Sequence, residues 1–179
     1  MTAIVFPVHR RQGEPTDAQL KSGKYKKRKI KWRGLTIAIE NEAGSVRRGK
    51  RPDGSTWETR MVFPYGYVER SEGVDGDEVD ITLGPNLDAP MVFIVHQRKV
   101  GDWRKYDEDK CFAGFDSEDD ARAAFLASYD DPRFLGPITV MPADEFVAKV
   151  KATNEAPAMI KAIVFFDKPR RADPASIPS

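Results

Sequence analysis

The sequence predicts an α+β domain, in which a small antiparallel β-barrel core carries two helices in the C-terminal half of the chain. Two observations predict this class. Short β-branched and apolar runs, bounded by turn residues, recur through most of the chain. Helix-forming segments with recognisable start signals come only late. Many short strands followed by two helices favour a barrel or an α+β arrangement.

The strands expected first are short runs between turn residues. Residues 30–32 and 35–40 are apolar or alternating. Residues 44–49 and 52–54 carry Gly, Pro and Asp and are expected to form turns. Residues 56–63 are therefore expected to return from these turns as a strand.

Further strands are expected where apolar and β-branched residues cluster again. The segment 90–97 has the strongest pattern of a buried strand, and 79–83 is a short β-branched run that ends at a Gly-Pro pair. The segments 111–115, 138–141 and 160–166 are shorter candidates.

Two helices are expected in the C-terminal half. Ser117 with Asp120 forms a loose capping box before 121–129, where Phe125 and Tyr129 stand four residues apart. Pro142 opens the second helix, because proline is tolerated in a first turn and acidic residues follow it.

Composition limits the classes of protein that remain. The chain has 179 residues, 40% of them hydrophobic, and 29 cationic against 28 acidic residues give a net charge of +1. This suits one globular domain and excludes a chain that is polyanionic or polycationic as a whole. The single cysteine, Cys111, excludes an intramolecular disulfide framework.

Localisation and boundaries follow from the same composition. No apolar run approaches the ~20 residues of a membrane span, and no secretory signal is present, so we expect a cytoplasmic protein without a membrane partner; its oligomeric state stays open. We expect an irregular lead-in at 1–22, a folded domain at 23–167 and a disordered, proline-containing tail at 168–179.

An acidic loop is the most informative segment. Asp75, Asp77 and Asp80 fall within six residues of a Gly-containing turn that enters a strand. Carboxylates this close repel one another unless a cation neutralises them. Oxygen ligands in small number suit Mg²⁺, and the alternative is a solvated acidic turn.

The surroundings of this loop resemble a known family. The run Phe63-Pro64-Tyr65-Gly66-Tyr67, followed after seven residues by Asp75-Gly76-Asp77 and then Asp80, resembles the signature of the family I soluble inorganic pyrophosphatases. Residues 39–45 and 106–110 resemble flanking pieces of that family. The order of motifs is most similar to the pyrophosphatase-like domain of phage polyvalent proteins. The resemblance covers roughly 35–151.

The resemblance implies a pyrophosphatase-like barrel and Mg²⁺-dependent hydrolysis of inorganic pyrophosphate to phosphate. Asp77 corresponds to the family's central aspartate, which acts as the base near the attacking water. Asp107, Glu108 and Asp109 compete for one family position in a second acidic cluster. The implied metal ligands are Asp75, Asp77, Asp80, Glu40, Asp107 and Glu108, and the implied catalytic and phosphate-binding residues are Asp77, Tyr65, Lys110, Arg47, Arg48 and Arg60.

The sequence also departs from the family pattern. Glu78 replaces the usual proline, and the second helix has 145–149 where the family carries a Tyr-Lys pair that grips phosphate. Hydrolysis of another phosphoanhydride or of a nucleotide therefore stays open.

A basic block gives a different functional hypothesis. Eight cationic residues and no acid lie between Lys21 and Arg33. Clustered cations with interleaved aromatic residues attract nucleic acid, so the alternative function is a non-catalytic phage- or prophage-derived protein that binds nucleic acid weakly through this block. Lysines that protect a solvated strand edge are the other explanation. The two histidines, His9 and His96, are expected to have structural roles.

Overall fold

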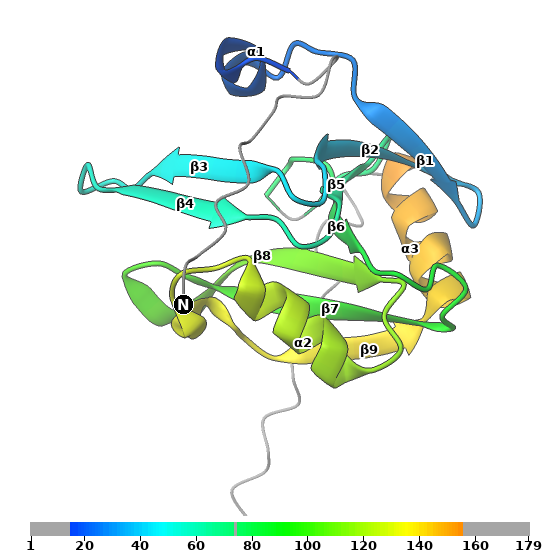
Figure 1. The fold of residues 1–179 in the computed structure, drawn as a ribbon. Coiled ribbons are helices and arrows are strands. Elements are labelled where there is room, and N and C mark those ends of the chain that lie inside the picture. Colours follow the sequence, from blue (N-terminus) through cyan, green and yellow to red (C-terminus); the bar gives the residue numbers. More distant parts are fainter. Residues whose placement is uncertain (1–14, 74, 156–179) are drawn as a thin grey trace, which may run out of the picture.

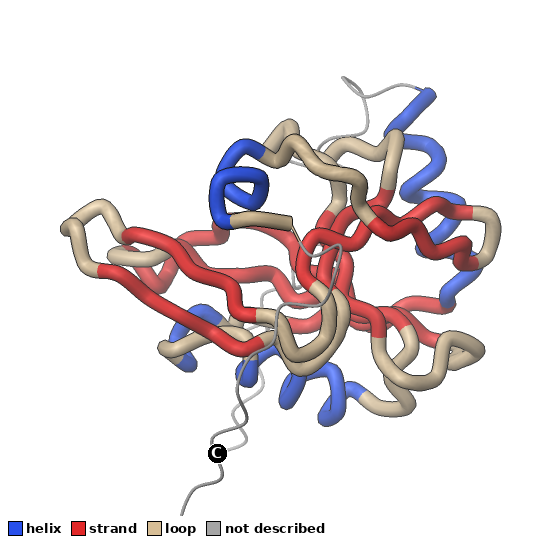
Figure 2. Tube along the Cα trace, turned by 45° about the horizontal axis from the view of Figure 1, so that its top comes forward, coloured by secondary structure: helices blue, strands red, loops and turns tan. Residues whose placement is uncertain are grey.

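The structure, a computed structural model, describes residues 15–73 and 75–155. A seven-stranded sheet with the order β1-β2-β5-β6-β8-β7-β9 forms its centre, and β3 and β4 form a separate hairpin that projects from it (Figures 1 and 2). The strands are β1 (Arg28–Trp32), β2 (Leu35–Asn41), β3 (Val46–Lys50), β4 (Thr56–Arg60), β5 (Tyr65–Val68), β6 (Asp80–Leu83), β7 (Met91–Lys99), β8 (Asp102–Ala113) and β9 (Ile138–Pro142). The helices are α1 (Asp17–Ser22), α2 (Glu118–Ala127) and α3 (Ala143–Glu155), with a 3₁₀ turn at Pro132–Phe134.

The sheet consists of two antiparallel halves. Strands β1, β2, β5 and β6 form one half, and β8, β7 and β9 form the other. The halves meet where β6 pairs with β8 in parallel. The sheet curls strongly (Figure 1), although its end strands β1 and β9 do not pair with each other within the described residues. The predicted α+β class with two helices in the C-terminal half is confirmed. The expected small antiparallel β-barrel core is a curled half-barrel, in which one pair of strands, β6 and β8, is parallel.

Each face of the sheet has its own core, because successive side chains of a strand point to opposite faces. On β7, Val92 and Ile94 join the larger cluster, which also contains Phe146 and Val150 of α3. Phe93 and its alternating neighbours join the cluster under α2. That second cluster contains no residue of β1, β2, β5 or β6. The α2 face of those four strands is therefore available for polar side chains.

Most predicted elements are confirmed, with corrections. The turn expected over 44–49 is strand β3, because 46–50 pair with 56–60 in a hairpin. The lead-in contains α1, which the Thr16–Gln19 capping box starts and the left-handed Gly23 ends. The strand expected at 111–115 begins much earlier, at Asp102. The strand expected at 160–166, the tail and residues 1–14 lie outside the described residues.

No helix in residues 15–73 and 75–155 combines the length and the apolar character that crossing a bilayer requires.

Candidate active site

Polar side chains gather on the face of the sheet that α2 leaves open. Tyr67 of β5 lies directly opposite Asp80 of β6. Ile81 and Cys111 are paired neighbours that point into the larger core, so the adjacent Asp80 and Lys110 share the opposite face. Three strands thus place an aromatic, an acidic and a basic residue together.

Lys110 is the centre of this group. Its Nζ contacts the Asp80 carboxylate, lies 2.9 Å from the Glu108 carboxylate and donates to Tyr65 Oη at 3.2 Å. Burial opposes its charge, since the residue is only 6% exposed, yet the pKa of Lys110 is raised well above its ordinary value because Tyr65, Tyr129, Asp80 and Glu108 face it. The ammonium has three donors and all three have a partner. Lys110 is a fixed positive charge among carboxylates.

Arg47 is the second cation that reaches the group. Its guanidinium lies 4.8 Å from the Tyr65 ring centroid and 5.5 Å from that of Trp57. Burial acts against its charge, but the pKa of Arg47 is raised because Tyr65, Tyr129 and the carboxylates beyond them outweigh burial. The hairpin therefore delivers one arginine to the sheet face.

The other two predicted arginines are placed elsewhere. Arg48 pairs with Glu58 at 2.7 Å, and Arg60 donates to the carbonyl of Gly44 at 2.8 Å. Arg48 follows Arg47 in a strand, so its side chain takes the other face of the hairpin.

Carboxylates form a small cleft beside Lys110. It has a volume of about 10 Å³, which is room for roughly one water-sized particle. Asp77, Glu40 and Asp107 do not line it. As placed, no three His, Cys, Asp or Glu side chains within 15–73 and 75–155 stand together as a metal centre. The lining residues are Gly73, Asp75, Glu78, Val79, Asp80, Glu108 and Asp109.

Burial and crowding by other carboxylates raise the pKa of Glu108 and of Glu40, and the sequence leads us to expect such crowding. Burial raises the pKa of Glu108, Lys110 opposes this, and Asp80 and Asp107 raise it further. Burial also raises the pKa of Glu40, with Asp80 adding to the effect and Lys27, 3.9 Å away, opposing it. A cation that entered this region would relieve both effects.

His96 makes two hydrogen bonds next to the cleft, one of them to the cleft residue Asp109. The His96 Nδ1 lies 2.7 Å from Asp109 Oδ1, and its Nε2 lies 2.7 Å from Thr139 Oγ1. Both ring nitrogens have a partner, as a structural histidine requires. This pair fixes the orientation of one cleft carboxylate.

Sequence reasoning missed two residues of the site, Tyr129 and Gln97. Tyr129 Oη donates to Gln97 Oε1, and Gln97 Nε2 donates to Glu108 at 3.1 Å. Burial raises the pKa of Tyr129 to about 12, and Lys110 and Arg47 oppose that shift. In the sequence Tyr129 looks only like a packing residue of α2, and nothing in its neighbours signals this contact.

Steric contact with β2 explains why glycine stands between Tyr65 and Tyr67. A Cβ at Gly66 would lie 1.9 Å from the backbone oxygen of Ala38 on β2. Only glycine lets β5 approach β2 this closely, and that approach places both tyrosines on the site face.

Comparisons with known proteins complete the description. Residues 17–151 match the family described as inorganic pyrophosphatase (InPase). Among solved structures, a crystal structure of an inorganic phosphatase from Anaplasma phagocytophilum is similar at 17% identity and a TM-score of 0.28, over 53% of this chain and 64% of that chain. The chain thus spans less than two thirds of that protein's length. No curated protein matches significantly.

Proposed function

The chain belongs to the inorganic pyrophosphatase family, whose match covers most of its length, and from this membership we propose that it hydrolyses inorganic pyrophosphate to phosphate with Mg²⁺, in the cytoplasm. Pyrophosphate is a highly charged anion. Its hydrolysis needs cations on its oxygens and an activated water.

One observation carries the proposal: a cleft of carboxylates lies directly beside two cations on a single sheet face. Asp80 and Glu108 line the cleft and also contact Lys110, while Arg47 approaches across the Tyr65 ring. Carboxylates suit a hard cation, and a neighbouring lysine and arginine suit phosphate oxygens.

The donors of the cleft fit Mg²⁺ by their chemistry, because they are all oxygens and Mg²⁺ uses few protein ligands. When bound, Mg²⁺ neutralises the substrate and lowers the pKa of the attacking water. The residues that would hold it are Asp75, Asp80, Glu108 and Asp109, with Asp77, Glu40 and Asp107 as the further ligands that the family pattern suggests.

The chemical step then needs few side chains. The oxygen of a water forms a bond to one phosphorus, and the bridging P–O bond breaks with its electron pair leaving on the second phosphate. Asp77 accepts the proton of the water. Lys110, Arg47 and Tyr65 hold the phosphate oxygens, with Lys110 acting as a point charge and Arg47 as a fork of donors.

The test is phosphate release from pyrophosphate, with Mg²⁺ and with a chelator. We expect activity in Mg²⁺ only, and a loss of about 100-fold or more in Asp77→Asn, as for removal of a general base. Asp119→Asn is the matched control, because Asp119 lies on the exposed first turn of α2. A wild-type chain that releases no phosphate, or a control as impaired as Asp77→Asn, would contradict the proposal.

The nucleic-acid hypothesis gains less support. Within the described residues, half of the eight cations of the basic block form ion pairs with nearby acids. These pairs are Lys27 with Glu40 at 3.9 Å, Arg28 with Glu42 at 2.7 Å, Lys29 with Glu69 at 2.7 Å and Arg33 with Asp144 at 3.1 Å. Such pairs favour a protected strand edge. Kinship with the phage domain stays a prediction that rests on the order of motifs between 106 and 129.

A further inference from the structure

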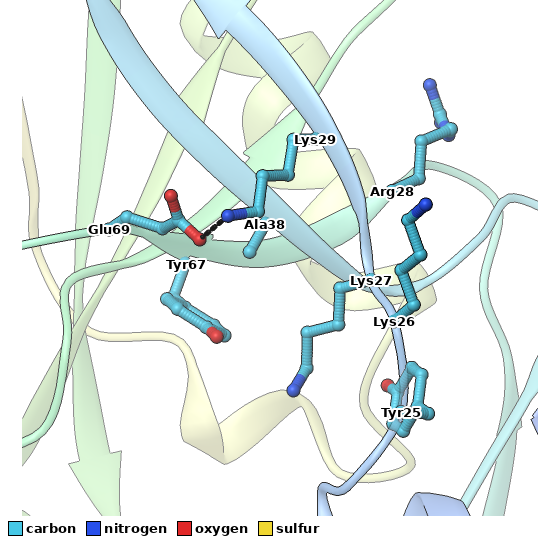
Figure 3. Close-up of a pocket in the computed structure, with 8 residues that line it drawn as sticks. All are labelled: Tyr25, Lys26, Lys27, Arg28, Lys29, Ala38, Tyr67 and Glu69. Atoms are coloured by element: carbon cyan, nitrogen blue, oxygen red, sulfur yellow. Dashed lines mark ion pairs between the residues drawn. The ribbon is translucent and has the colours of Figure 1, made fainter.

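A groove with a volume of about 530 Å³ lies over β1, β2 and β5, and Figure 3 shows the residues that line it. This size is within the range of small-molecule binding sites. The catalytic residues proposed above do not line it. Its lining residues are Tyr25, Lys26, Lys27, Arg28, Lys29, Ala38, Tyr67 and Glu69.

The groove exists because a small residue sits between long ones. Lys29, Ala38 and Tyr67 form a row across β1, β2 and β5, each opposite the next. Ala38 belongs to neither core cluster and lines the groove from beneath, where the side chains around it leave it only 1% exposed. A larger side chain at this position would push against those side chains and narrow the hollow.

The walls present cations and phenol rings to the hollow. The Lys27 ammonium points between the two tyrosines, 4.7 Å from the Tyr25 ring centroid and 5.7 Å from that of Tyr67, whereas Lys26 and Arg28 point away (Figure 3). Lys29 reaches Glu69 at 2.7 Å from an exposed position. Lysines beside aromatic rings are suited to a phosphate that carries further phosphates or a ring.

The groove adjoins the active site through paired residues of β5 and β6. Tyr67 lies opposite Asp80 across the β5–β6 pair, and Glu40 lies 3.9 Å from Lys27. Three strand spacings separate β6 from β1, which amounts to roughly 14 Å. Pyrophosphate is much shorter than this span, so a ligand that occupies both regions must be longer.

We propose that this groove holds the part of a phosphoanhydride substrate that extends beyond the scissile bond, so that the protein binds longer phosphoanhydrides more tightly than pyrophosphate. The inference rests on the proposed function and names its substrate class. The oxygen of a water would form a bond to the phosphorus at the carboxylate cleft while its proton passes to Asp77, as in the step proposed above. The bridging P–O bond would break, and the leaving phosphate chain, with the electron pair, would remain in the groove until release.

The test measures binding directly, with analogues that are not hydrolysed. Methylenediphosphonate and an α,β;β,γ-bis(methylene) nucleoside triphosphate, in which both anhydride oxygens are replaced, are titrated calorimetrically into the full chain with Mg²⁺. We expect the longer analogue to bind at least tenfold more tightly. This advantage disappears in Lys29→Ala, which removes a cation, and in Ala38→Val, which narrows the hollow. It persists in Lys24→Ala, which belongs to the basic block but does not line the groove.

The outcomes separate the two proposals. Binding of the short analogue without an advantage for the long one overturns the groove alone, and so does an advantage that survives both groove variants. Binding of neither analogue overturns the proposed function together with this inference. The bis(methylene) analogue of tripolyphosphate then distinguishes the sources of affinity. If it binds as tightly as the nucleotide analogue, the phosphate chain is recognised; if only the nucleotide analogue binds more tightly than methylenediphosphonate, the nucleoside is recognised. One further outcome would overturn the proposal: a single-stranded oligonucleotide binds through Lys29, and none of the extended phosphoanhydride analogues does.

Discussion

At the scale of single residues, the positive charge of Lys110 neutralises the carboxylates around it. Its ammonium is shared between Asp80, Glu108 and Tyr65. Under the proposed function, a divalent ion at the same carboxylates would compete with this lysine and would free its ammonium to bind a phosphate oxygen. Metal loading and substrate binding would then be coupled through one side chain.

We expect Lys110→Met to lower kcat/KM for pyrophosphate about 30- to 1000-fold, the equivalent of roughly 2–4 kcal/mol of transition-state stabilisation. Affinity for Mg²⁺ should rise, because the carboxylates lose their resident positive charge. Steady-state kinetics and calorimetric Mg²⁺ titration measure the two effects. Lys105→Met, on the exposed β7–β8 hairpin, is the control. A fall of both affinity and activity would show that Lys110 does not compete with the metal.

Tyr129 gives a prediction about pH. Its pKa is raised to about 12 from an ordinary value near 10, so folding favours the neutral phenol. This contribution is complete below pH 10 and is lost as the pH rises towards 12; it amounts to about 2–3 kcal/mol. Urea unfolding at pH 9 and pH 11 should show a smaller loss of stability in Tyr129→Phe than in the wild type. Equal losses would contradict the assignment.

At the scale of elements, the β3–β4 hairpin is a separate two-stranded sheet that supplies a residue to the main one. Arg47 lies between the Trp57 ring of the hairpin and the Tyr65 ring of β5. Trp57 in turn packs over Gly49, where an added Cβ would lie 2.4 Å from the indole ring. The position of Arg47 thus depends on the absence of a side chain at Gly49, two residues further along the same strand.

We expect Gly49→Val to displace Trp57 and with it Arg47. KM for pyrophosphate should rise about tenfold, while the thermal midpoint changes little because the hairpin lies outside both core clusters. Kinetics and thermal unfolding test this pair of outcomes. Arg48→Ala, on the other face of the same hairpin, should change neither; an unchanged KM in Gly49→Val would mean that Arg47 is held in another way.

The elements also show how far the sequence predicts this molecule. Strands with apolar alternation, such as β7, were predictable because burial imposes the pattern. The hairpin strand β3, with the sequence Val-Arg-Arg-Gly-Lys, was predicted as a turn because its stability comes from pairing with β4 and not from burial. Of the site, the acidic loop and Lys110 were predictable from motif order. Tyr129 and the groove were not, because they depend on which strands become neighbours.

At the scale of the whole molecule, binding of the proposed cation would be linked to folding. The cleft draws its carboxylates from the loop before β6, from β6 itself and from β8, so an ion held there would join both halves of the sheet. Any ligand that binds the folded chain and not the unfolded one stabilises it by mass action.

We therefore expect saturating Mg²⁺ to raise the thermal midpoint by a few degrees, since 100 times Kd contributes about 2.7 kcal/mol. Thermal unfolding with Mg²⁺, with a chelator and with K⁺ at equal ionic strength measures the shift. Asp80→Asn should abolish it, whereas Asp144→Asn, at the exposed start of α3, should retain it. A shift of equal size in Asp80→Asn would place the cation elsewhere.

The parallel β6–β8 pair has a consequence for how activity is acquired. Asp80 and Lys110 are 30 residues apart in sequence and meet only where β6 pairs with β8. The segment between them must therefore lose its conformational freedom before the stabilising contacts between β6 and β8 can form. A chain synthesised in two pieces, divided between β6 and β7, would carry half of the reaction centre on each piece. Neither piece could act alone, and recovery of activity on mixing would show that β6 and β8 had paired. The Trp32–Phe146 contact between β1 and α3 would help to hold the two pieces together on the other face of the sheet.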